Sequence, residues 1–70
     1  MVLKVSASRA LKDALAFPAK EPFERCLGQS VRRHGGTYED YVELMSLVRE
    51  TARRRKIAVR EAARILAGQP

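Results

Sequence analysis

Four cations stand side by side in this 70-residue sequence: Arg53, Arg54, Arg55 and Lys56. Adjacent cations repel one another and gain nothing from a protein core, because an unpaired buried charge is costly. The planar guanidinium group of arginine matches the geometry of a phosphate bidentately. The run therefore predicts a surface that binds an anionic partner. The simpler alternative is that it keeps the end of a helix in water.

The charge of the whole chain indicates the same chemistry. The formal net charge is +6 at pH 7, and arginine supplies ten of the fourteen cations. Seven cations and two acids fall within residues 49–64, whereas three acids and no cation fall within residues 37–48. A small arginine-rich chain that is polarised in this way is typical of nucleic-acid-binding proteins. A basic protein without such a partner is the alternative.

The residues around the cationic run resemble a helix-turn-helix motif. Ala52 provides the small side chain of the first helix, and Ile57 provides the apolar side chain after the turn. Ala62 and Ile65 would face inward from the second helix. Lys56 departs from the pattern, because glycine usually allows the sharp turn. The resemblance implies binding to double-stranded DNA, with the start of the second helix at base edges and the preceding cations on phosphates.

The nucleic-acid surface predicted from these patterns contains nine cations. DNA is favoured over RNA by the motif and by the few aromatic residues, which fall mostly at apolar or capping positions and leave little to stack on unpaired bases. If the segment after the turn only packs back on the preceding helix, its arginines form a solvated face instead. The nine candidate residues are Arg32, Arg33, Arg49, Arg53, Arg54, Arg55, Lys56, Arg60 and Arg64.

Apolar residues recur at helical spacing in four segments. This spacing predicts an all-α fold: a compact bundle of about four short-to-medium helices, with a helix-turn-helix-like pair at its C-terminal end, in a single domain over 1–70. Serine caps, prolines and glycines bound the segments. The predicted segments are Ser6 or Ser8 to Pro18, Pro22 to Gly35, Tyr38 to Arg55, and Val59 to Ala67.

The third segment carries an apolar arc that is wider than one neighbouring helix covers. Thr37 and Asp40 predict a capping box at its start. As a helix the segment would be about 27 Å long, which is long for a domain of this size. This length predicts either a central helix that packs on two sides or the seam of a homodimer. If the arc is an interface, the chain is a helical interaction module or a subunit of a larger assembly, which could include RNA. The candidate interface residues are Tyr41, Val42, Leu44, Leu47 and Val48.

The sequence predicts neither catalysis nor a metal or cofactor site. Cys26 is the one cysteine and lies on the apolar face of the second segment, so it is expected to be an inert core residue. His34 is the one histidine, and no nucleophile or carboxylate pairs with it in the sequence pattern. The acids Glu39, Asp40 and Glu43 suit the first turns of a helix through its dipole.

The chain has no apolar run near the length of a bilayer-spanning helix and no signal peptide at its start. We therefore expect a cytoplasmic protein with no membrane partner. A ribbon-helix-helix dimer is a third possibility, in which Met1 to Val5 forms the paired strand. Pro18 and Pro22 break the spacing that this fold requires.

Overall fold

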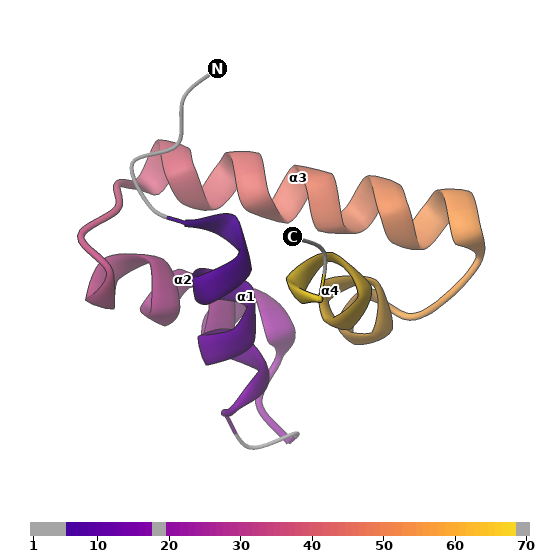
Figure 1. Cartoon of the computed structure of the whole chain (residues 1–70), viewed down its shortest axis with the longest axis horizontal. Helices are drawn as coiled ribbons and strands as arrows, with labels where there is room; N and C mark the ends of the chain where they lie inside the picture. Colours follow the sequence, from indigo (N-terminus) through magenta and orange to yellow (C-terminus); the bar gives the residue numbers. More distant parts are fainter. Residues whose placement is uncertain (1–5, 18–19, 69–70) are drawn as a thin grey trace.

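The computed structural model describes residues 6–17 and 20–68. It contains four helices: α1 (Ala7–Leu15), α2 (Phe23–Arg33), α3 (Tyr38–Arg55) and α4 (Val59–Ala67). Figure 1 shows α3 as one long helix across the molecule, with the three shorter helices beneath it. The described residues contain no strand, and the predicted all-α fold is confirmed. The strand of the ribbon-helix-helix alternative falls on residues 1–5, outside the described residues.

Side-chain caps define where α1 and α3 begin. Ser6 accepts a hydrogen bond from the backbone N–H of Arg9. Thr37 and Asp40 form the predicted capping box, in which each side chain accepts from the backbone N–H of the other. The N–H of Thr37 lies 2.9 Å from Oδ2 of Asp40, and the N–H of Asp40 lies 3.3 Å from Oγ1 of Thr37. As a result, α3 begins at Tyr38, as predicted.

Helices α2 and α3 end in the same backbone motif with different residues at its left-handed position. Gly35 has a φ of 81°, and Lys56 has a φ of 57°. In each motif the next residue donates its N–H to a carbonyl five positions earlier, Gly36 to Val31 at 2.8 Å and Ile57 to Ala52 at 3.0 Å. These contacts define Schellman motifs. Because a Cβ atom is strained at positive φ, Lys56 costs about 1 kcal/mol that glycine would not.

Exchanges at these two positions are expected to change stability in opposite directions. Lys56→Gly should raise the free energy of unfolding by up to about 1 kcal/mol, because glycine relieves the strain. Gly35→Ala should lower it by about 1 kcal/mol through strain alone, since no atom lies within 4 Å of the added Cβ. Urea denaturation followed by circular dichroism measures both changes. A loss of stability in Lys56→Gly would contradict the assigned strain.

One hydrophobic core joins all four helices. Helix α3 packs against α2 and α4, and α1 packs against the same two helices. The hydroxyl of Ser30, buried in this core, donates to the carbonyl of Ala10 at 2.7 Å, which satisfies a polar group that would otherwise be costly. The largest fully buried apolar side chains are Leu11, Leu27, Leu44, Val31, Val48 and Cys26. Thus α3 packs against two other helices, as does α1, and this packing does not by itself exclude the predicted homodimer seam. Cys26 is buried as predicted.

The buried residues of α4 are all alanines, and Val59 and Leu66 pack against the core from its border. Ala62, Ala63 and Ala67 are buried. Ile65, which was expected to face inward, is only half-buried and is not among the side chains that pack against the core. The prediction for Ile65 was wrong because α4 packs against α1 as well as α3. Short side chains allow the close approach of the helices that this double contact requires. No helix in the described part of the chain is long and apolar enough to cross a membrane.

Candidate nucleic-acid interface

Three of the predicted cations form an open group at the end of α3. Arg53, Arg55 and Lys56 are exposed, and none of them makes an ion pair with another described residue. Successive helical residues are about 100° apart, so Arg53 and Arg55 project to sides of α3 that differ by about 160°. Lys56 lies in the turn that follows. The group, which we call the α3 basic end, therefore presents charge around the end of the helix rather than on one flat face.

Three other predicted cations on α3 and α4 already have carboxylate partners. Exposed ion pairs of this kind contribute about 0–1 kcal/mol, so a phosphate can compete for the arginine. A backbone hydrogen bond at Glu24, and then the hydrogen bond and charge of Arg49, hold the pKa of the Glu24 carboxyl below its usual range. The three pairs are Arg54 with Glu50 at 3.0 Å, Arg64 with Glu61 at 3.5 Å, and Arg49 with Glu24 at 3.3 Å.

Arg60 joins the start of α4 to the start of α2. Its guanidinium group donates to the carbonyl of Glu21 at 3.1 Å. The same group lies over the ring of Phe23, 5.8 Å from the ring centroid. Arg60 was predicted to lie at base edges. Its contacts are made within the protein instead, which favours a structural part in placing α4.

Arg32 and Arg33 lie away from the α3 basic end. Arg60 of α4 contacts α2 at Phe23, the first residue of that helix, whereas Arg32 and Arg33 are at its other end. Arg33 pairs with Asp13 of α1 at 3.3 Å. Arg32 lies near Thr37 at the start of α3, and the helix rises about 24 Å from there to Arg53. The nine predicted residues therefore do not form one continuous surface.

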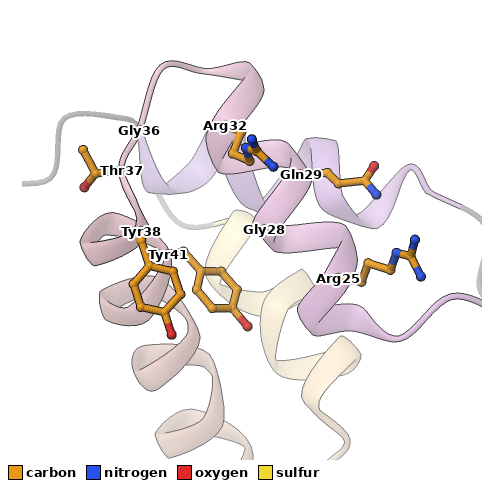
Figure 2. A pocket seen from close by; sticks show the side chains of 8 residues that line it. All are labelled: Arg25, Gly28, Gln29, Arg32, Gly36, Thr37, Tyr38 and Tyr41. Carbon is orange, nitrogen blue, oxygen red and sulfur yellow. The ribbon is translucent and has the colours of Figure 1, made fainter.

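A second candidate site is a groove of about 620 Å³ between α2 and the start of α3 (Figure 2). Two arginines and a glutamine of α2 and two tyrosines of α3 line it: Arg25, Gln29, Arg32, Tyr38 and Tyr41. The Tyr38 side chain is 77% exposed. The sequence pattern predicts the tyrosines at apolar or capping positions, whereas the structure exposes the Tyr38 ring. The sequence does carry a signal for the exposure of Tyr38: this residue comes directly after the capping residue Thr37 and before the apolar arc.

The predicted interface residues of α3 separate into core and border positions. Leu44 and Val48 are fully buried in the core of the chain. Val42 and Leu47 are 41% and 45% exposed. They are five positions apart, or about 140° around the helix, so they border the buried arc on opposite sides. Tyr41 is half-buried and belongs to the groove. The exposed members of the set do not make one contiguous apolar patch.

Within the described ranges, no group of three or more histidine, cysteine, aspartate or glutamate side chains is placed to hold a metal ion. Comparisons of the chain with protein-family models, with curated proteins and with solved structures found no match. Any assignment of function therefore rests on the geometry and charge of the α3 basic end and of the groove.

Proposed function

We propose that this protein binds nucleic acid, preferentially double-stranded DNA, through the α3 basic end. The observation that carries the proposal is the group of three exposed cations, Arg53, Arg55 and Lys56, that have no carboxylate partner among the described residues. Each can neutralise a backbone phosphate and release a condensed counterion. A single cation or two would satisfy the helix dipole, so the excess favours an anionic partner.

The backbone of Lys56 supports this proposal. Its φ of 57° lies in the left-handed region, where glycine is the residue that relieves strain. The chain instead carries a cation there, at a cost of about 1 kcal/mol. Strained residues of this kind gather at functional sites. A charge used in binding would account for a lysine at this position.

The α3–α4 pair supports the preference for a duplex. Ala52 and Ala62 are buried, as the resemblance to a helix-turn-helix motif requires. The opposed directions of Arg53 and Arg55 suit phosphates on the two strands that flank a major groove about 12 Å wide. Because Arg60 is engaged within the protein, we expect contacts mainly to the backbone and a weak dependence on base sequence.

Removing two cations of the α3 basic end is expected to weaken duplex binding and to reduce its salt dependence. Each lost phosphate contact should lower the slope of log K against log salt concentration by about 0.9. For the double variant Arg53→Ala/Arg55→Ala, the magnitude of this slope should therefore fall by about 1.8. Fluorescence anisotropy of a labelled mixed-sequence duplex, titrated at several salt concentrations, measures this change.

Arg54→Ala is the matched control, because Arg54 lies between the two targets and already pairs with Glu50. Arg54→Ala should lower the slope by less than the value of about 0.9 that is expected for each of the two targets. An unchanged slope in the double variant would overturn the proposal. Light scattering at low and high salt tests the alternative of a protein-interaction module, which a stable dimer without duplex binding would favour.

A further inference from the structure

The two tyrosine rings of the groove make a platform for an unpaired base. Tyr38 is 77% exposed, so a π-face of its ring is open to solvent. Tyr41 lies beside it, with ring centroids 5.8 Å apart and a tilt of 37° between the planes. Tyr41 is half-buried against the core and supports the more exposed ring. Every nucleobase has a π-face, so stacking on such a ring does not depend on base identity.

The opposite wall of the groove supplies positive charge without acids. Arg25 and Arg32 are exposed and make no ion pair in the described part of the chain. They are seven positions apart, which places them on one face of α2 about 10 Å from each other along its axis. Gln29 lies between them, as Figure 2 shows. No carboxylate is among the described lining residues.

The groove has the size of a ligand site. Gly28 also lines it, next to Tyr41, and a Cβ atom on Gly28 would lie 3.9 Å from two ring carbons of Tyr41, in ordinary van der Waals contact. The volume of about 620 Å³ falls within the range of small-molecule sites. The exposure of Tyr38 leaves the groove open at its side, which suits a base attached to a strand.

We propose that this groove binds an unpaired nucleotide of a single-stranded nucleic acid, with the base on Tyr38 and the flanking phosphates on Arg25 and Arg32. The site lies at the end of α3 opposite to the basic end. The choice of nucleic acid as the ligand rests on the proposed function. The location of the site rests on the geometry of the tyrosine rings and the two guanidinium groups. The protein then has separate contacts for paired and unpaired strands.

The tyrosines themselves report on the site. The chain has two tyrosines and no tryptophan, and both tyrosines line the groove. Titration with a short oligothymidylate should therefore quench the intrinsic emission along a saturable curve, after correction for absorption. Thymidine monophosphate should require a higher concentration for the same quenching. No saturable quenching, or equal potency of the mononucleotide, would overturn the assignment to a strand.

Substitutions at Tyr38 test the stacking directly through anisotropy of a labelled oligothymidylate. Tyr38→Ala should weaken single-strand binding at least about five-fold, the change that corresponds to about 1 kcal/mol of stacking. Tyr38→Phe keeps the ring and should bind like the unmodified protein. Equal losses in both variants, or no loss in Tyr38→Ala, would contradict a stacking role. Circular dichroism of each variant checks its fold.

The two proposed sites can fail separately. Tyr38→Ala should leave duplex binding unchanged, and Arg53→Ala/Arg55→Ala should leave the tyrosine quenching saturable. Quenching that persists without duplex binding would support the groove and overturn the role of the α3 basic end. Duplex binding without saturable quenching would support the α3 basic end and overturn the role of the groove.

Discussion

Replacing Leu44 with alanine is expected to remove much of the stability of this protein. The Leu44 side chain is fully buried in the middle of α3, among residues of the shared core. Its truncation leaves a cavity and should lower the free energy of unfolding by about 2–5 kcal/mol. A domain of this length typically has a total of about 3.5–10 kcal/mol. Thermal and urea denaturation followed by circular dichroism measure the loss.

Leu47→Ala is the matched control, with the same chemical change three positions further along α3. Leu47 is 45% exposed, so its truncation should cost less than about 1 kcal/mol in a monomer. Equal costs for the two variants would contradict the assignment of Leu44, and not Leu47, to the core. A cost at Leu47 that falls as the protein is diluted would show that a second copy covers this residue.

Replacing Phe23 with alanine is expected to cost about 3–5 kcal/mol of unfolding free energy. Phe23 is the first residue of α2 and is 6% exposed. Its ring also lies under the guanidinium group of Arg60, which ties α4 to α2. The variant therefore loses core packing and a cation–π contact together. Urea denaturation should show a large decrease in the midpoint, or no cooperative transition.

A double-mutant cycle separates these two contributions. Phe23→Leu keeps most of the apolar burial but removes the ring, and Arg60→Ala removes the cation. Measured alone and together, they should give a coupling energy of about 0.5–1 kcal/mol. A coupling energy near zero would show that the ring does not help to hold Arg60. In that case the hydrogen bond to the Glu21 carbonyl is the tether that places α4.

The helices and their limits could be predicted from the sequence because local interactions determine them. The capping box of Thr37 and Asp40 marks the start of α3 within four residues of sequence. The left-handed position of Gly35 ends α2 in the same local manner. The limits of α3 and α4 agree with those predicted, as does the burial of Cys26. Each of these features depends on residues within one or two helical turns.

The arrangement of the two candidate sites was decided only by the tertiary structure. Arg60 is engaged by Glu21, 39 positions away, and Arg49 by Glu24, 25 positions away. No local pattern shows which of several cations will find such a distant partner. The groove likewise needs α2 and α3 to come together before Arg32 and Tyr38 can line one space. The position of Ile65 depends on α1 as well as on α3, because α4 packs between them.

Sequence alone thus predicts that the chain is helical and rich in surface cations, since both follow from local composition. Which cations are free to bind a partner depends on contacts between segments that are distant in the sequence, because the packing of the helices brings those segments together.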